Sequence, residues 1–484
     1  MNLFLLNHEL LVLALGLGLL LVDLWLPTPA KRKLGYAAAL GVGLILLYSL
    51  CCVRLVPGQT VHYAFGQMYA LDHLALFFKR FFLLAALIVL LISVEFADRI
   101  AAGIAEFYAL TLFALSGMLF AASVNDFALL FVSLELITVT FYVLTSFQRA
   151  RVASLEAGVK YLIIGALSTG FTVFGIALVY GLSQTLNFGG LAGVAAHLCG
   201  NKIFLFGLVL ILVGLGFKIA AFPFQIWAPD VYQGAPTPVT AFLAVGSKAA
   251  GFALLLRVLF IAVPDITAQW SNLLIILSGV SILYGNLCAI PQRNLKRLLG
   301  YSSIAHAGYM LLGVAALSAA GRSAVLYYLS GYLFTVLAAF TVLCLALRQV
   351  EGEDIGALAG LHRRSPLLAV TMTLAMASLA GIPPLAGFFG KFLLLKAVLE
   401  QAPANAGYYC LTFTALAGVV ISIYYYFGVV RAIYWFQDTP DLSPISISRP
   451  IRVAIYACIA GMFYLGIFPG AIVNLAAEAV RVLR

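Results

Sequence analysis

Long apolar stretches recur along nearly the whole chain, and they constrain its fold more than any other feature. About fourteen stretches of roughly 20 residues are rich in Leu, Ile, Val, Phe and Ala, and short polar connections separate them. A helix needs about 20 apolar residues to cross the roughly 30 Å hydrocarbon layer of a bilayer. A soluble core could not cover so much apolar surface, whereas a bilayer accepts it. The sequence therefore predicts an all-α polytopic membrane protein with about 14 transmembrane helices.

The expected spans leave no room for a soluble domain. The first stretch lacks a basic start and is too long for the apolar part of a signal peptide, so we interpret it as the first membrane helix. The stretch 366–399 is too long for one straight helix. The spans are 3–26, 35–56, 73–96, 104–122, 126–148, 156–182, 203–227, 237–262, 271–290, 299–318, 323–348, 366–399, 407–432 and 450–472.

Composition excludes several classes of protein. Hydrophobic residues make up 64% of the chain and charged residues 10%, where soluble domains have roughly 45–50% and 25%. The net charge of +10 comes from short loops between apolar stretches, so it indicates topology and lipid contact, and we expect no nucleic-acid partner. The seven cysteines are scattered, and no Cys/His cluster suggests a metal, haem or iron–sulfur site. We therefore expect no metal and no redox cofactor in this chain.

Basic residues in the connections predict the orientation. Fifteen of them follow odd-numbered spans, and five lie on the opposite side. Because basic loops stay in the cytoplasm, this asymmetry predicts that both termini lie outside it. The larger group is Lys31, Arg32, Lys33, Arg99, Arg149, Arg151, Arg293, Lys296, Arg297, Arg348, Arg363, Arg364, Arg431, Arg449 and Arg452; the smaller is Arg54, Lys202, Arg322, Arg481 and Arg484.

Four charged residues lie where the centre of the bilayer is expected. A charged side chain at mid-bilayer costs roughly 2.5–3.5 kcal/mol on insertion scales. Residues that persist there face a polar interior and usually have a function in it. The four are Glu135 in span 126–148, Lys218 in 203–227, Lys248 in the first half of 237–262 and Lys391 in 366–399.

These residues have a structural and a functional interpretation. Lys391 could snorkel to an interface, and Glu135 and Lys218 could form one ion pair between two helices. One acid and three bases exceed what a single structural pair requires. Burial favours the neutral form of a lysine and a nearby carboxylate favours its charged form, so small rearrangements can switch such a site. Because lysine can lose its proton where arginine effectively cannot, the set favours a proton relay.

Other polar residues within the spans are weaker candidates. His306 could relay protons near pH 7, and a hydrogen-bonded core histidine would have the same sequence signature. We interpret Tyr424, Tyr425 and Tyr426 as packing or anchoring residues. Five further charges are expected nearer the membrane interfaces and receive no function: Lys79, Arg80, Glu106, Arg257 and Lys396.

Two of the expected helices are interrupted by proline. Pro223 follows Lys218, whereas Pro383 and Pro384 precede Lys391. Proline removes a backbone donor and frees a carbonyl, so each break puts polar backbone groups beside a buried lysine. Interrupted helices in corresponding positions of two halves indicate inverted repeats around a midplane ion site. The order of break and lysine is reversed between the halves, as inversion predicts.

Three runs of sequence resemble a known family. They are 216–248, which contains Asp-Val-Tyr-Gln-Gly-Ala-Pro, 294–309, which contains Tyr-Ser-Ser-Ile-Ala-His-Ala-Gly-Tyr, and 381–392, which contains Gly-Ile-Pro-Pro-Leu-Ala-Gly-Phe-Phe-Gly-Lys. They resemble the antiporter-like membrane subunits of proton-pumping NADH:quinone oxidoreductase, respiratory complex I, and within that family subunit N. The similarity extends over nearly the whole chain, and the first run is highly specific.

The resemblance implies a fold with defined boundaries. Such subunits form a single membrane domain of two inverted five-helix repeats with broken helices 7 and 12. Carried onto this chain, helices 1–3 cover residues 1–103 and helix 14 lies in 450–484. The first repeat, helices 4–8, covers 104–262, and the second, helices 9–13, covers 271–432.

The resemblance also implies functions for individual residues. Glu135 matches the glutamate of helix 5, and the lysines of helices 7, 8 and 12 match Lys218, Lys248 and Lys391. Sister subunits usually carry histidine on helix 8, so Lys248 favours subunit N. Relatives commonly have histidine where this chain has Gln225. Glutamine can hydrogen-bond but cannot titrate, so it stays open whether Gln225 replaces a relay histidine.

The implied function is proton translocation by a non-redox subunit of an enzyme complex. In this hypothesis Glu135 pairs with Lys218, the lysines at 218 and 248 take up a proton through water, and His306 or water passes it to Lys391. FMN and iron–sulfur clusters belong to partner subunits, and quinone binds elsewhere. Expected partners are the sister antiporter-like and small membrane-arm subunits, the lipid bilayer, protons and water. The implied location is the inner membrane of a bacterial cell, with both termini periplasmic.

Two alternatives stay open. The first is an Mrp-type cation/proton antiporter subunit, which shares the fold and the helix-7 lysine; co-purification with flavin and iron–sulfur subunits distinguishes it. The second is a non-pumping scaffold subunit whose ion pairs only hold a membrane arm together. Neutralising Lys218 in an assembled complex separates a scaffold from a pump.

Overall fold

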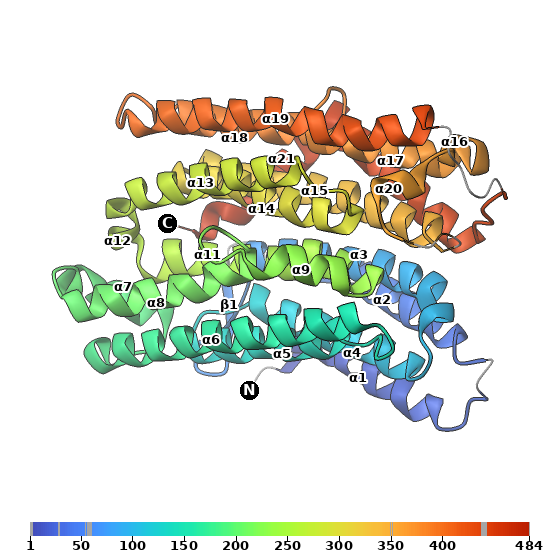
Figure 1. The fold of residues 1–484 in the computed structure, drawn as a ribbon. Helices are drawn as coiled ribbons and strands as arrows, with labels where there is room; N and C mark the ends of the chain where they lie inside the picture. Colours follow the sequence, from blue (N-terminus) through green and yellow to red (C-terminus); the bar gives the residue numbers. More distant parts are fainter. Residues whose placement is uncertain are drawn as a thin grey trace.

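Long helices lie side by side in one bundle (Figure 1). The structure is a computed structural model that describes residues 3–27, 30–53, 55, 61–348, 350, 352–436 and 443–483. Within these ranges, 13 helices are long and apolar enough to cross a membrane. The expected span 366–399 is split into two shorter helices. The predicted all-α polytopic class is confirmed.

The N-terminal part consists of three helices and a hairpin. Asp72 ends the hairpin and caps the third helix, because its carboxylate accepts the Ala75 N–H at 2.7 Å. The hairpin was not predicted from the sequence. The elements are α1 (Asn7–Asp23), α2 (Lys33–Cys51), β1 (Val61–Ala64), antiparallel β2 (Tyr69–Asp72) and α3 (His73–Phe96), with short 3-10 turns at Leu3–Leu6 and Ala97–Arg99.

The next group of helices covers residues 104–262. Its last rod is continuous from 237 to 262 but contains two π-helical turns, η4 and η5. The elements are α4 (Ile104–Ala122), α5 (Phe127–Thr145), α6 (Val152–Ser183), α7 (Phe188–Leu198), α8 (Lys202–Ile219), α9 (Trp227–Gly234), α10 (Thr237–Phe242), η4 (Leu243–Ser247), α11 (Lys248–Arg257) and η5 (Val258–Ala262).

The third group lies along the other side of the bundle, coloured yellow to orange in Figure 1. It consists of α12 (Pro264–Gln269), α13 (Ser271–Ala289), α14 (Leu295–Ala315), α15 (Ala319–Ala346), α16 (Leu361–Arg364), α17 (Pro366–Ala380), α18 (Ala386–Leu399) and α19 (Gly407–Trp435), with a 3-10 turn at Ile355–Leu358. The chain ends with α20 (Arg449–Ile467), α21 (Gly470–Ala479) and a 3-10 turn at Val480–Val482.

Three rods form the centre of the molecule. The buried share of the most apolar window is 100% in 237–262, 94% in α14 and 89% in α15, whereas it is 28% in α6 and 33% in α19. The first three rods are therefore shielded from lipid by their neighbours, and a polar site can form between them. The outer helices α6 and α19 present apolar side chains on the surface of the bundle.

Both predicted helix breaks are confirmed. Helix α8 ends at Ile219, Ala220 adopts a left-handed conformation with φ of 57°, and α9 resumes at Trp227. Helix α17 ends at Ala380, Gly381 has φ of 90°, and α18 begins at Ala386. Left-handed residues of this kind end a helix by returning their N–H groups to its last carbonyls. The prolines at 223, 383 and 384 lie inside the two breaks.

Some expectations need correction or stay open. The expected span 203–227 ends early, at Ile219, because the break precedes Pro223. Helix α7 was not expected; with 11 residues it is too short to cross a bilayer. Arg54 and Arg484, two residues used for the orientation, lie outside the described residues. Both ends of the described chain lie toward the end of the bundle opposite the α1–α2 connection (Figure 1). The division into repeats at 104–262 and 271–432 stays a prediction.

Candidate functional site

Four of the five predicted relay residues are buried in the centre of the bundle. The exposed fraction is 3% for Lys218, 2% for Lys248, 4% for Lys391 and 3% for His306. Glu135, on α5, is only partly buried. The four buried side chains come from α8, α11, α18 and α14, so elements far apart in the sequence build one site.

Lys218 lies in the last turn of α8, where the negative end of the helix dipole favours a cation. Its Nζ donates to Thr138 Oγ1 of α5 at 2.9 Å. Glu135, one turn earlier on α5, accepts instead from Thr169 Oγ1 of α6 at 2.7 Å. The direct Glu135–Lys218 pair of the sequence hypothesis is therefore absent from this structure. The carboxylate stays within electrostatic range of the lysine.

Lys248 directly follows the π-helical turn η4, a feature that often marks functional sites. Its Nζ donates to both the carbonyl and the hydroxyl of Ser303 on α14. The Ser303 hydroxyl also bonds the hydroxyls of Tyr232 at 2.9 Å and Tyr332 at 3.2 Å. Ser303 thus connects Lys248 to two tyrosines from different helices.

Lys218 and Lys248 lie on facing surfaces of α8 and α11. Gly251, one turn after Lys248, packs against the Lys218 stem. A Cβ added at Gly251 would come within 3.3 Å of Lys218 Cγ, which is a tight contact. The missing side chain at this position lets the two lysine-bearing helices approach closely.

His306 lies one turn after Ser303 on α14, and both of its ring nitrogens are hydrogen-bonded. Nδ1 is 2.6 Å from the Tyr328 hydroxyl, and Nε2 is 2.9 Å from the Tyr426 hydroxyl. Tyr426 in turn lies 2.5 Å from Ser302 Oγ. Tyr426, interpreted from the sequence as a packing or anchoring residue, is thus also a hydrogen-bond partner of the candidate histidine.

Lys391 reaches from α18 across the second break to the end of α17. Its Nζ donates to the carbonyls of Leu379 at 2.8 Å and Ala380 at 3.0 Å, and it lies 5.0 Å from the ring centroid of Tyr309. These carbonyls are the negative end of the α17 dipole. A Cβ at Gly381 would lie 3.0 Å from Lys391 Cδ, so glycine there serves both the left-handed turn and the lysine.

A small cavity joins His306 to the second break. Its volume is about 10 Å³, and its walls include His306, Tyr332, Thr335, Ser378 and Leu379. This is about the space that one water molecule needs. Leu379, whose carbonyl accepts from Lys391, thus also lines the cavity beside His306. Polar groups therefore follow one another from Lys218 to Lys391 through the middle of the bundle.

Two buried ion pairs were missed by the sequence analysis. Lys79 pairs with Glu9 at 2.7 Å, and Arg257 pairs with Asp72 at 2.8 Å, with exposed side-chain fractions of 0% to 1%. Lys79 and Arg257 had been expected near the membrane interfaces without a function. Glu106 and Lys396 are exposed, whereas α1, the hairpin, α3 and α11 enclose the two pairs; the depth of these charges in the membrane stays a prediction.

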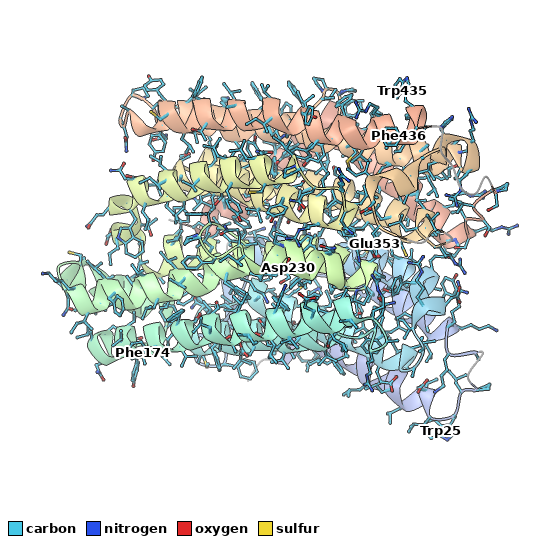
Figure 2. All side chains as sticks on the ribbon, in the orientation of Figure 1. Trp25, Phe174, Asp230, Glu353, Trp435 and Phe436 are labelled. Atoms are coloured by element: carbon cyan, nitrogen blue, oxygen red, sulfur yellow. The ribbon has the colours of Figure 1, made fainter. Side chains whose placement is uncertain are left out.

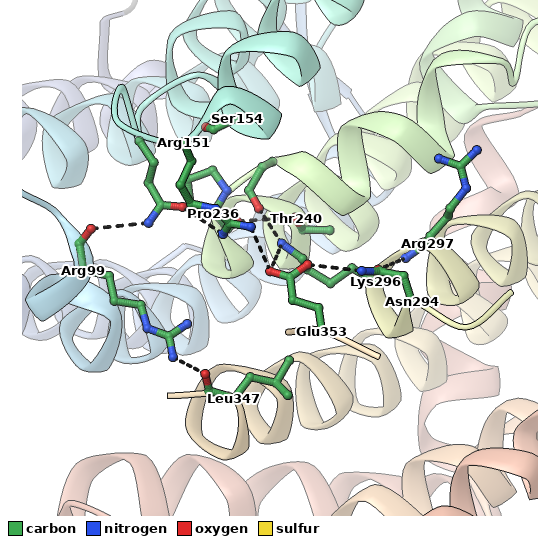
Figure 3. A network of polar contacts seen from close by, with 12 residues as sticks. Arg99, Arg151, Ser154, Pro236, Thr240, Asn294, Lys296, Arg297, Leu347 and Glu353 are labelled. Atoms are coloured by element: carbon green, nitrogen blue, oxygen red, sulfur yellow. Dashed lines mark hydrogen bonds and ion pairs between the residues drawn. The ribbon is translucent and has the colours of Figure 1, made fainter. Parts of the chain in front are cut away.

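Lys296 was also misjudged, as a loop charge. It belongs to α14, which begins at Leu295 and not near residue 299, and its exposed side-chain fraction is 1%. Its Nζ donates to the Ala235 carbonyl at 3.0 Å and pairs with Glu353 at 3.0 Å. Arg151 pairs with the same carboxylate at 3.4 Å. Figure 3 shows Glu353 between these two cations, where it joins the two sides of the bundle.

Gln225 lies inside the first break and is buried, and its Oε1 has no hydrogen-bond partner within the described ranges. Across all described residues, no group of three or more His, Cys, Asp or Glu side chains is placed to hold a metal ion.

Comparison with known proteins identifies the family. The family described as NADH:quinone oxidoreductase/Mrp antiporter, TM matches residues 124–422. NADH-quinone oxidoreductase subunit N of Trichlorobacter lovleyi is 39% identical over 487 aligned residues, which cover 100% of this chain and 98% of that protein. A chain of respiratory complex I from Thermus thermophilus has a TM-score of 0.78 and 36% identity, and the match covers 97% of this chain and 99% of that one.

A chain of the Mrp complex from a Dietzia species is similar to this chain in fold alone. Its TM-score is 0.85 at 20% identity, over 100% of this chain and 98% of that one. The full-length matches at higher identity confirm the resemblance found in the three sequence runs. This chain belongs to the NADH-quinone oxidoreductase subunit N family, and its fold is that of the antiporter-like membrane subunits.

Proposed function

We propose that this subunit moves protons across the membrane through its buried lysines, while partner subunits supply the redox energy. One observation carries the proposal: Lys218, Lys248 and Lys391 are each less than 5% exposed, and among the described residues their hydrogen-bond acceptors are hydroxyl and carbonyl oxygens, not carboxylates. A buried ammonium without a carboxylate partner loses its hydration without full compensation. Its charge therefore responds to small changes in its surroundings.

The hydroxyl partners suit both protonation states of the amines. A threonine or serine hydroxyl accepts a hydrogen bond from an ammonium, and after rotation it donates one to a neutral amine. Thr138 and Ser303 stand in this position toward Lys218 and Lys248. In the proposal Glu135 influences Lys218 through space, because a nearby carboxylate favours the charged form of an amine.

The proposed route crosses the centre of the bundle. A proton passes from Lys218 to Lys248 where α8 and α11 face each other, and then to the Ser303 hydroxyl. The Ser303–Tyr332 contact and His306 continue the route. A water molecule in the small cavity then connects His306 to the break where Lys391 receives the proton.

Energy for this transfer comes from outside the chain. Moving one charge against 100 mV requires about 2.3 kcal/mol. In our proposal FMN, iron–sulfur clusters and quinone are held by partner subunits, and contacts with sister antiporter-like and small membrane-arm subunits transmit the energy. The proposed setting is a bacterial inner membrane with both termini in the periplasm, since the basic connections lie toward the other face.

The test is proton pumping in membrane vesicles that carry Lys218→Ala, with assembly checked by native gel. We expect electron transfer and assembly to survive while pumping falls. Lys396→Ala is the matched control, because Lys396 is 60% exposed and pairs only with Glu400 of its own helix. Pumping at the wild-type level in an assembled Lys218→Ala complex would overturn the relay and leave a scaffold function.

A second candidate function is cation/proton antiport. The fold shared with a chain of the Mrp complex favours it. The same vesicles distinguish the two functions, because antiport would make proton movement depend on external sodium. Pumping that is driven by electron transfer and unchanged by sodium supports the first function.

A further inference from the structure

A large groove lies along the outer side of α19, near the end of the bundle that carries the basic connections. Its volume is about 800 Å³, and it runs between α19 and the connection from α13 to α14. Ile290, Ile423 and Phe427 form an apolar wall, and the rim carries Arg293 and Arg431. No residue of the proposed relay lines this groove, so its occupant is a separate question.

The two rim arginines are among several arginines on this face that form no ion pair within the described residues. Neither Arg293 nor Arg431 has a carboxylate within 4 Å in the described part of the chain, and Arg431 only stacks over the Phe436 ring at 6.0 Å. Asp354 also lines the groove, but it forms no ion pair with either arginine. Four other arginines on this face are each paired with a carboxylate: Arg32, Arg151, Arg297 and Arg348.

The rim lies at the depth of a membrane–water interface. Trp435 at the end of α19 is 70% exposed, and Trp gathers at headgroup level in membrane proteins. Figure 2 shows Trp435 and Phe436 at the same end of the bundle as Trp25, which is 78% exposed at the end of α1. From Arg431 the groove wall extends to Ile423, about 12 Å along the helix, into the apolar layer.

From this geometry we infer that the groove binds an anionic phospholipid, with its phosphate between Arg293 and Arg431 and its acyl chains along the apolar wall. Guanidinium groups bind phosphate through paired hydrogen bonds. Basic pockets between membrane helices on the cytoplasmic side are suited to anionic headgroups. The groove combines the two features that a phospholipid needs: an apolar wall on α19 for acyl chains, and beside it two cations that form no ion pair within the described residues.

Gly428 offers a way to block the groove without touching the arginines. It lines the groove, and a Cβ added there would meet no atom within 4 Å. A leucine at this position would therefore extend into the groove while the helix packing stays intact. Glycine to leucine also favours the helix, so the variant is expected to fold.

The experiment uses the purified intact complex in nanodiscs that contain a phosphatidylglycerol with a photoactivatable acyl chain. After irradiation, labelled peptides are mapped by mass spectrometry. We expect labelling of α19 around residues 423–431, and at least a tenfold loss of it in R293Q/R431Q and in G428L. Arg149→Gln, an exposed arginine on the same face but outside the groove, should label like the wild type.

Three results would overturn the inference. Equal labelling by a matched phosphatidylcholine probe would show that the arginines do not select an anionic headgroup. Full competition by millimolar inorganic phosphate would show a free-anion site in place of a lipid site. Labelling elsewhere in the complex but not on α19 would show that another subunit covers the groove.

Discussion

This molecule contains two sets of buried cationic side chains. Both sets are almost fully buried, but one set is paired with carboxylates and the other is not. Lys79 and Arg257 lie beside carboxylates at 2.7 and 2.8 Å, among α1, the hairpin, α3 and α11. Lys218, Lys248 and Lys391 lie along the centre of the bundle, and within the described residues their amines hydrogen-bond neutral oxygens and no carboxylate. Burial alone therefore does not distinguish a structural cation from a candidate relay residue; the counter-ion does.

The difference follows from the energetics of buried charge. Removing one partner of a buried pair strands the other charge and costs about 3–5 kcal/mol, so paired cations keep their charge. Arg257 cannot lose its proton in any case, and both its contacts to Asp72, at 2.8 and 2.9 Å, fix its position. The unpaired lysines have no such anchor for their charge. Paired cations such as Arg257 are therefore suited to holding helices together, and the unpaired lysines are suited to proton transfer.

Loss of the arginine in the Asp72 pair should have the largest effect. Arg257→Met leaves Asp72 buried without a counter-ion, and we expect the subunit to lose about 3–5 kcal/mol of stability. The measurement is the amount and the melting temperature of assembled complex on native gels. The double variant Arg257→Met/Asp72→Asn should recover most of the loss, because asparagine can still cap α3. A single variant that assembles and melts like the wild type would refute the structural assignment.

The other pair should respond in the same direction but less strongly. Lys79→Met strands Glu9, whose Oε1 keeps a hydrogen bond from the Tyr69 hydroxyl at 3.2 Å. We expect a loss near the lower end of the range for a broken buried pair, about 3 kcal/mol. Thermal melting of the complex measures it, and Glu9→Gln in the Lys79→Met background should restore stability. If the double variant is no more stable than the single one, the two residues do not act as a pair.

Substitution of an unpaired lysine should affect pumping strongly and stability little. Lys248→Met strands no carboxylate, and methionine has nearly the same shape, so the stability change should stay below about 1.5 kcal/mol. Electron-transfer-driven pumping in vesicles should nevertheless fall by about tenfold or more. Assembly comparable to the wild type together with lost pumping separates this residue from Arg257. A loss of assembly as severe as that of Arg257→Met would make Lys248 structural too.

Much of this contrast could be predicted from the sequence, because it depends on local patterns. Apolar length places the helices, and the prolines at 223, 383 and 384 place both breaks within a few residues. A lysine inside an apolar run is visible without any partner, which is why Lys218, Lys248 and Lys391 were found. The family resemblance added their assignment to helices 7, 8 and 12.

The counter-ions could not be predicted, because they come from distant parts of the chain. Asp72 and Arg257 are 185 residues apart, and Glu9 and Lys79 lie on different helices. The sequence shows how far Lys79 lies from the start of its helix but not that other elements cover that end of the helix and bury the side chain. The same limit explains why the predicted Glu135–Lys218 ion pair is not found. The Lys218 side chain reaches α5, but it donates to Thr138 there, and Glu135 accepts from Thr169 of α6.

The smallest effect should come from the hydroxyl that connects Lys248 to the tyrosines. Ser303→Ala removes the bonds to Tyr232 and Tyr332, while the Ser303 carbonyl still accepts from Lys248. One hydrogen bond contributes about 1 kcal/mol, so pumping should slow about fivefold at nearly normal stability, and Ser303→Thr should restore it. Ser154→Ala is the control, because that buried hydroxyl bonds only the Thr145 carbonyl, at 2.8 Å, away from the relay. If both alanine variants change melting equally and neither changes pumping, Ser303 is a packing residue and protons reach His306 by another path.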